Sequence, residues 1–250
     1  MAVFRGKLWV GSFDNGLCRL DKTGWTHFEG AAFLPSDMVN HMAASRRRLY
    51  VATLKGVAII DKKGNFTQHT VEQCFDNNKN PCPWHASVTG VAVDKVTGRT
   101  WVSDTGAVHR LGSTRWKHFY KYSGIKSDRV TRIAARDGFI VVGTGDMGLH
   151  WRSGDSRGKF ITVDDQHGPA DNWVMDVEFD NAGALWVATC TRGISRYLDG
   201  KWRTLTVADG LVDDYTLTVS EIDSRIWVGT LSGVTILTET GPVTLTTAQG

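Results

Sequence analysis

The stretch Leu185–Tyr197 reads LWVATCTRGISRY. It consists of a short apolar run, a polar turn ending in glycine, and a second alternating run, which is the pattern of a β-hairpin. Five related phrases occur elsewhere in the chain: LWVGSFDNGLCRL from Leu8, LYVATLKGVAII from Leu49, TWVSDTGAVHRL from Thr100, IVVGTGDMGLHWR from Ile140 and IWVGTLSGVTIL from Ile226. One hairpin therefore repeats six times, and every other segment is placed relative to it.

The spacing of these phrases predicts the fold. Their first residues are 8, 49, 100, 140, 185 and 226, a period of roughly 40 to 50 residues, and four strands per such unit are typical of a propeller blade. We therefore expect an all-β, six-bladed β-propeller with four antiparallel strands per blade, formed as a single domain by residues 1–250. Residues 241–250 are expected to supply the last strand of the sixth blade, and residues 1–5 a short first strand of the first.

The repeats resemble the two-component regulator propeller repeats of bacterial ligand-binding sensor domains. That family combines an LWVGT strand, a GL phrase with an Arg-Tyr pair, a Trp strand and a DGLPS-Asn-x-Val loop. The corresponding loops here are LPSDMV (34–39), GIKSDRV (124–130), GPADNWV (168–174) and GLVDDYT (210–216). The resemblance implies a recognition module that binds a small molecule, glycan or protein on its top face, at the central channel.

Composition excludes several other classes. Charged residues make up 22% and apolar residues 41%, as in globular proteins, and the net charge of +3 is too small and scattered to indicate a nucleic-acid partner. No apolar run approaches the roughly 18 to 20 residues of a membrane helix, and no signal peptide is visible. Cys74 and Cys82 bracket a long insertion at 70–87; they form a disulfide, which would indicate a periplasmic or secreted protein, or remain free thiols, or bind a metal together with His85.

Two sets of polar residues recur around the start of each blade's first strand. The reference point is the valine-like residue that begins the first strand of blades 2 to 6: Val39, Val88, Val130, Val174 and Thr216. The first set lies two residues before it and contains Asp37, Asp128, Asn172 and Asp214. Carboxylate and amide oxygens that converge at the channel would suit a divalent metal, Ca²⁺ better than Zn²⁺. Alternatively, each residue accepts hydrogen bonds from the backbone of its own turn, and no cofactor is needed.

The second set lies two residues after the valine-like position and differs from blade to blade. It contains His41, Arg132 and Asp176. A histidine near an ionised Asp and an Arg could act as a general base, so these are the candidate catalytic residues. The alternative is a salt bridge in the tunnel beside a water-bound histidine, and a β-bulge would change which way each side chain points.

Aromatic and polar residues in the loops that enter the blades form the candidate ligand-binding set. They are Trp84, His85, Trp173, Tyr215, His167 and Asp171. Trp173 and Tyr215 hold the same position in neighbouring blades, so one ligand could touch both, although such rings also cover blade seams. The main functional interpretation is ligand recognition. The alternative is a metal-assisted enzyme at the tunnel mouth, either a lyase or a hydrolase of esters, lactones or phosphotriesters.

Overall fold

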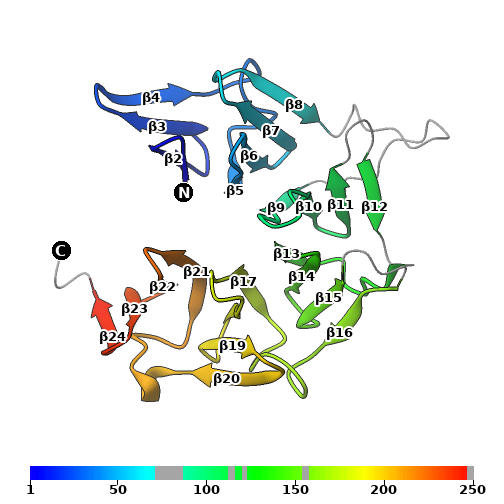
Figure 1. The fold of residues 1–250 in the computed structure, drawn as a ribbon, viewed down its shortest axis with the longest axis vertical. Helices are drawn as coiled ribbons and strands as arrows, with labels where there is room; N and C mark the ends of the chain where they lie inside the picture. The colour runs from blue at the N-terminus through cyan, green and yellow to red at the C-terminus, as the bar shows by residue number, and fades with distance from the viewer. Residues whose placement is uncertain (71–86, 112–115, 120–122, 154–157, 247–250) are drawn as a thin grey trace. The chain divides into compact units, whose positions relative to one another are not determined.

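The structure is a computed structural model that describes residues 1–70, 87–111, 116–119, 123–153 and 158–246. Its 24 strands form six sheets, each with four antiparallel strands in chain order (Figure 1). This confirms the predicted all-β fold, a six-bladed β-propeller with four strands per blade. Within the described ranges, no helix is both long and apolar enough to cross a membrane.

Residues Met1–Tyr120 form one compact unit and contain blades 1 to 3. Blade 1 contains β1 (Ala2–Phe4), β2 (Lys7–Gly11), β3 (Leu17–Asp21) and β4 (Gly24–Phe28). Blade 2 contains β5 (Val39–Ala44), β6 (Arg48–Thr53), β7 (Gly56–Asp61) and β8 (Phe66–Thr70). Blade 3 contains β9 (Val88–Val93), β10 (Thr100–Asp104), β11 (Val108–Leu111) and β12 (Trp116–Phe119). The short first strand expected from residues 1–5 is therefore present.

Residues Lys121–Gly250 form the second compact unit and contain blades 4 to 6. Blade 4 contains β13 (Val130–Arg136), β14 (Phe139–Thr144), β15 (Leu149–Ser153) and β16 (Ile161–Val163). Blade 5 contains β17 (Val174–Phe179), β18 (Leu185–Thr189), β19 (Ile194–Leu198) and β20 (Lys201–Leu205). Blade 6 contains β21 (Thr216–Ile222), β22 (Arg225–Thr230), β23 (Val234–Thr238) and β24 (Gly241–Leu245), so the C-terminal segment supplies its last strand as expected.

The LWV phrase is apolar throughout because its strand is buried on both faces. In β18, Leu185 and Val187 join a core cluster with residues of blade 4, whereas Trp186 and Ala188 join a cluster with residues of blade 6. Successive side chains of a strand point to opposite faces, so one short phrase fills two blade seams. The indole N–H of Trp186 donates to Oδ2 of Asp180 at 2.9 Å, which satisfies its one polar atom.

A β-bulge interrupts the first strand of blades 2 to 6 just after the valine-like residue. In blade 5, Val174 pairs with Thr189 and Asp176 with Ala188, so Met175 is the extra residue. The glycine in β14 serves the same seam, because a Cβ on Gly143 would lie 2.6 Å from a methyl group of Val174. Glycine there allows the first strand of the next blade to approach closely.

Each blade has two distinct ends. The turn end, as we call it, carries two turns: the one between the first and second strands and the one between the third and fourth strands. The loop end carries the turn between the second and third strands and the segment that enters the blade. Antiparallel strand order fixes this division in every sheet. The predicted site residues that the structure describes lie at or near the loop ends.

Candidate functional site

The structure brings Arg132 and Asp176 together. Nε of Arg132 in β13 lies 3.3 Å from Oδ1 of Asp176 in β17, and the Asp176 side chain is buried. Its second oxygen, Oδ2, accepts hydrogen bonds from the hydroxyl of Thr218 at 2.7 Å and from the backbone N–H of Val219 at 3.0 Å, both in β21. One carboxylate therefore connects the first strands of blades 4, 5 and 6.

His41 has a partner of its own. Its Nδ1 lies 3.3 Å from the backbone nitrogen and 3.1 Å from the carbonyl oxygen of Val91 in β9, the first strand of the next blade. Val91 holds the position in β9 that Val219 holds in β21. His41 and Asp176 thus both contact the backbone of the following blade. These contacts account for both residues as ties between blades, and their catalytic role stays a prediction.

The predicted metal ligands Asp37, Asn172 and Asp214 share one backbone contact. In each, Oδ1 accepts a hydrogen bond from the N–H seven residues earlier, with the donors Gly30 at 2.7 Å, Asp165 at 3.0 Å and Val207 at 2.8 Å. The side chains therefore close the loop that enters the blade. Asp128 is exposed.

Those contacts match the turn-acceptor alternative. Among the residues that the structure describes, no group of three or more His, Cys, Asp or Glu side chains is arranged to hold a metal ion. No chemical step is therefore routed through a metal at this ring, and the calcium site stays a prediction.

A recurrent hydrogen-bond motif shapes the loop ends of blades 4 to 6. The motif is built on the residue three positions before the valine-like residue. Its side chain accepts a hydrogen bond from the backbone N–H two residues later and also hydrogen-bonds to a side chain in the turn between the second and third strands of its own blade. Ser127 bonds to the N–H of Arg129 and to Asp146, Asp171 to the N–H of Trp173 and to Thr191, and Asp213 to the N–H of Tyr215 and to Ser232. The hydroxyl and carboxylate exchange places between blade 4 and the other two, and the geometry is retained.

The residues held by this motif are Arg129, Trp173 and Tyr215. Their carbonyl oxygens accept the N–H groups of Gly145 at 2.8 Å, Cys190 at 2.9 Å and Leu231 at 3.2 Å. Each backbone is thus fixed on both sides, whereas the side chains project outward. Trp173 is 47% exposed and Tyr215 48%, and Arg129 is also exposed.

Arg129 is a candidate that the sequence analysis missed. It holds the position directly before the first valine-like residue, which is the position of Trp173 and Tyr215 in the next two blades. Alignment on that position, rather than on residue type, would have found it. Exposed Met147 and Leu231 lie in the hairpin turns of blades 4 and 6, and the N–H of Leu231 donates to the carbonyl of Tyr215.

The remaining predicted ligand-binding residues divide into three cases. Asp171 supports Trp173 and accepts a hydrogen bond from the hydroxyl of Thr191 at 2.7 Å. Burial, and after it the charge of Asp171, raises the pKa of the Cys190 thiol. His167 is exposed, and its Nδ1 lies 3.3 Å from Asp164. Trp84 and His85 lie outside the described residues, as do Cys74 and Cys82.

The entering loops are also anchored from inside the blade. Nε2 of His150 accepts the N–H of Lys126 at 3.1 Å, and the hydroxyls of Ser195 and Thr235 accept the equivalent loop N–H groups of blades 5 and 6 at 3.0 Å. His150 is fully buried, and burial lowers its pKa to about 4, so it is neutral at pH 7 and able to accept. The loop that carries Arg129 is therefore rigidly placed.

Comparison with known proteins shows the fold and leaves the family open. No protein-family model and no curated protein sequence matches the chain. Among solved structures, it is similar to a virginiamycin B lyase from Staphylococcus aureus, with a TM-score of 0.72 and 14% identity over 98% of this chain and 82% of that one. It is also similar to YCF48 from Cyanidioschyzon merolae, with a TM-score of 0.64 and 17% identity over 92% and 78% of the two chains.

A third similar structure is the extracellular domain of a putative hybrid two-component system from B. thetaiotaomicron. The TM-score is 0.64 and the identity 11%, and the match covers 96% of this chain but only 42% of that one. The predicted sensor-type resemblance is thus present at the level of fold. At such identities the similarity speaks for the propeller architecture alone.

Proposed function

We propose that this protein is a ligand-recognition β-propeller that binds a glycan or another small molecule with a flat apolar face. Trp173 and Tyr215 form its contact surface at the loop ends of blades 5 and 6. The observation that carries the proposal is that two exposed aromatic side chains stand at equivalent positions of neighbouring blades, each with its backbone N–H and C=O hydrogen-bonded.

Rigid aromatic side chains are effective contact surfaces. Trp and Tyr offer large apolar faces with few rotatable bonds, so little conformational entropy is lost when a ligand packs on them. A fixed backbone lowers that cost further, because no loop must be ordered on binding. Sugar rings suit such a surface, since one face presents C–H groups and the rim presents hydroxyls.

Polar groups around the two rings would supply orientation. Arg129 precedes blade 4 at the same position and adds a cation with several N–H donors. Asp213 beside Tyr215 keeps a lowered pKa, chiefly through the hydrogen bond from Ser232, and is charged at neutral pH. This mixture of aromatic and charged groups is typical of small-molecule sites, in which a few polar groups select the ligand.

The resemblance to two-component regulator propeller repeats supports a sensor role for this recognition. The similarity to the extracellular domain of a two-component system is consistent with a periplasmic or extracellular setting, but at 11% identity it adds only the shared fold. In that role the propeller would report the presence of a ligand to a signalling partner rather than transform the ligand.

A screen on a glycan array tests the proposal directly. The wild-type chain is compared with the double variant Trp173→Ala/Tyr215→Ala and with Trp25→Ala, a matched control that removes a 51% exposed Trp from β4 of blade 1. We expect the wild type and Trp25→Ala to bind the same glycans and the double variant to lose them. Equal binding by all three, or binding of no glycan or small molecule by the wild type, would overturn it.

The enzyme alternative keeps its own test. A metal content near one per chain, together with hydrolase or lyase activity that disappears in His41→Ala or Asp176→Asn, would favour it over recognition. The similarity to a lyase does not carry that alternative, because 14% identity speaks for fold alone.

A further inference from the structure

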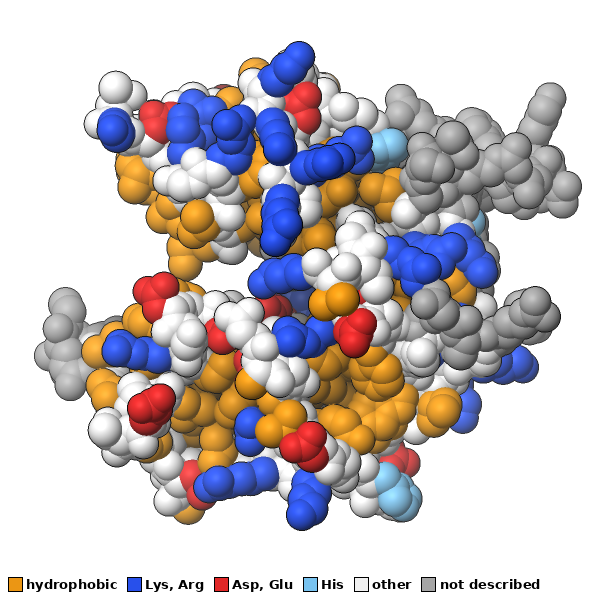
Figure 2. Space-filling model, in the orientation of Figure 1, with side chains coloured by type: hydrophobic (Ala, Val, Ile, Leu, Met, Phe, Trp, Pro, Cys, Tyr) orange, Lys and Arg blue, Asp and Glu red, His pale blue; other side chains and the backbone are white. Residues whose placement is uncertain are grey.

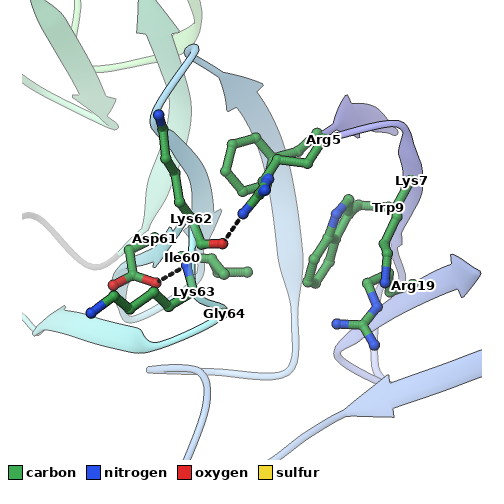
Figure 3. A pocket seen from close by; sticks show the side chains of 10 residues that line it. Arg5, Lys7, Trp9, Arg19, Ile60, Asp61, Lys62, Lys63 and Gly64 are labelled. Carbon is green, nitrogen blue, oxygen red and sulfur yellow. Dashed lines mark hydrogen bonds between the residues drawn. The ribbon is translucent and has the colours of Figure 1, made fainter.

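A cavity of about 320 Å³ lies at the turn ends of blades 1 and 2. One wall is the β1–β2 turn with Arg5 and Lys7, backed by Trp9 and Arg19. The other wall is the β7–β8 turn, which contains Lys62 and Lys63. Figure 3 shows the guanidinium of Arg5 and the ring of Trp9 facing that turn. The volume is within the range of small-molecule sites.

The cavity is strongly cationic. Five Lys and Arg residues line it, against one acid, Asp61. The Asp61 carboxylate is occupied by its own turn, where it accepts the N–H groups of Lys63 at 2.7 Å and Asn65 at 2.9 Å. Among the described residues, neither Lys62 nor Lys63 forms an ion pair within 4 Å.

Behind the wall formed by the β1–β2 turn, a single carboxylate forms ion pairs with two cations. Asp21 lies 3.3 Å from Nζ of Lys7 and 2.8 Å from the guanidinium of Arg19. These contacts lower the pKa of Asp21, with the hydrogen bond from Lys7 as the largest cause, and one positive charge remains uncompensated. Residues 1–120 as a whole carry 16 Lys and Arg against nine Asp and Glu. Lys and Arg side chains also gather over blades 1 and 2 on the face in view in Figure 2.

Arg5 occupies a backbone position where blades 4 and 6 use aspartate. It is the first residue of a two-residue hairpin turn and has a φ of 55°, followed by Gly6 at 69°. The residues with positive φ at the same position of the turn between the first and second strands in blades 4 and 6 are Asp137 and Asp223. Asp, Asn and Gly tolerate this left-handed conformation best, so an arginine here is disfavoured by the turn itself. Its guanidinium donates to the carbonyl of Lys62 across the cavity and retains further N–H donors.

The buried ring of Trp9, which is 3% exposed, forms the aromatic back of the cavity. The guanidinium of Arg19 lies over the Trp9 ring, 5.5 Å from its centroid, which keeps both groups in place. Arginine donors in a fixed position beside an aromatic wall match a tetrahedral oxyanion on a compact organic body.

We propose that this cavity is a second binding site, which takes a small molecule carrying a phosphate or sulfate group through Arg5 and the surrounding cations. The proposal is independent of the proposed function, because it uses the turn ends of blades 1 and 2 rather than the loop ends of blades 5 and 6.

Isothermal titration calorimetry at low ionic strength tests the proposal, with glucose 6-phosphate, inorganic phosphate and uncharged glucose as probes. The test variant is Arg5→Asn, which suits the turn and is expected to fold as well as the wild type, as circular dichroism would verify. The control is Lys201→Asn, which removes an exposed cation next to the β19–β20 turn, at the turn end of blade 5.

We expect glucose 6-phosphate to bind the wild type and Lys201→Asn equally, and Arg5→Asn at least tenfold more weakly. Any binding of glucose should be unaffected by Arg5→Asn, added NaCl should weaken the binding of glucose 6-phosphate, and Trp173→Ala/Tyr215→Ala should leave the Arg5-dependent binding of glucose 6-phosphate unchanged. A loss of similar size in Lys201→Asn, or unchanged binding in Arg5→Asn, would overturn the proposal. So would binding that is confined to vesicles of phosphatidic acid, which would assign the cations to a lipid surface.

Discussion

Asp176 in β17 accepts a hydrogen bond from the backbone N–H of Val219 in β21, 3.0 Å away, so a side chain of one blade binds the backbone of the next. His41 contacts Val91 at the corresponding position in another pair of blades. Residues that differ in chemistry therefore occupy one structural role. For His41 and Asp176, the difference in residue type is compatible with a scaffold that needs a hydrogen-bond acceptor at this position, whereas Arg132 at the same position of blade 4 is a cation beside Asp176.

Replacing Asp176 tests this role. Asp176→Ala leaves Arg132 without its carboxylate and the N–H of Val219 without its acceptor in a buried seam. We expect it to lower the free energy of unfolding by about 3 kcal/mol, the lower end for a broken buried pair because Arg132 is partly exposed. Urea denaturation measures the change, with the exposed turn residue Asp14→Ala as control. A loss below about 0.5 kcal/mol, as for an ordinary surface residue, would contradict the role.

The pKa of His150 predicts a specific pH dependence. Burial lowers this pKa from 6.5 to about 4, so between these values the unfolded chain binds a proton that the folded chain does not. Stability from this group is therefore complete above pH 6.5, falls as the pH drops toward 4, and changes by up to about 3 kcal/mol in total.

His150→Thr isolates that contribution, since Thr235 already accepts the loop N–H in blade 6. Urea denaturation at pH 7 and pH 5 should give the variant a smaller loss of stability between the two pH values than the wild type. An identical loss in both proteins would show that His150 does not titrate in this way.

Gly143 should not tolerate a side chain because Val174 lies too close, and shortening Val174 should relieve the clash. A Cβ there would lie 2.6 Å from a methyl group of Val174, so Gly143→Ala is expected to cost about 1–3 kcal/mol by overpacking. Adding Val174→Ala should recover part of that loss, which a double-mutant cycle measures. Gly145→Ala is the control, because its Cβ would make only ordinary contacts at 3.7 Å. Strict additivity of Gly143→Ala and Val174→Ala would refute the proposed contact.

Asp214 distinguishes a loop acceptor from a calcium ligand. Its carboxylate accepts a hydrogen bond from the N–H of Val207. Asp214→Ala should therefore lower the free energy of unfolding by about 1–2 kcal/mol, and the loss should be the same in EDTA and in calcium. Differential scanning calorimetry of both proteins under both conditions measures this. A wild-type Tm that falls in EDTA, with no such response in Asp214→Ala, would instead establish the predicted metal site.

Local patterns predicted the blades because each LWV phrase carries its own strand signal and its own seam-filling residues. The β-bulge after Val174 was not predictable, since one extra residue in a first strand leaves no clear mark on the hydrophobic alternation, and it decides which side Asp176 faces. Trp173 and Tyr215 could be aligned because both are aromatic, whereas Arg129 differs in type. The cavity beside Arg5 needed the structure, because its two walls are more than fifty residues apart in the chain.

The most direct measurement is the affinity of one captured glycan for three proteins by isothermal titration calorimetry: the wild type, Trp173→Ala and Tyr215→Ala. If one ligand spans both rings, each single variant should bind at least tenfold more weakly, with stability within about 0.5 kcal/mol of the wild type because both side chains are exposed. Unchanged affinity in either variant would contradict a shared recognition surface on blades 5 and 6.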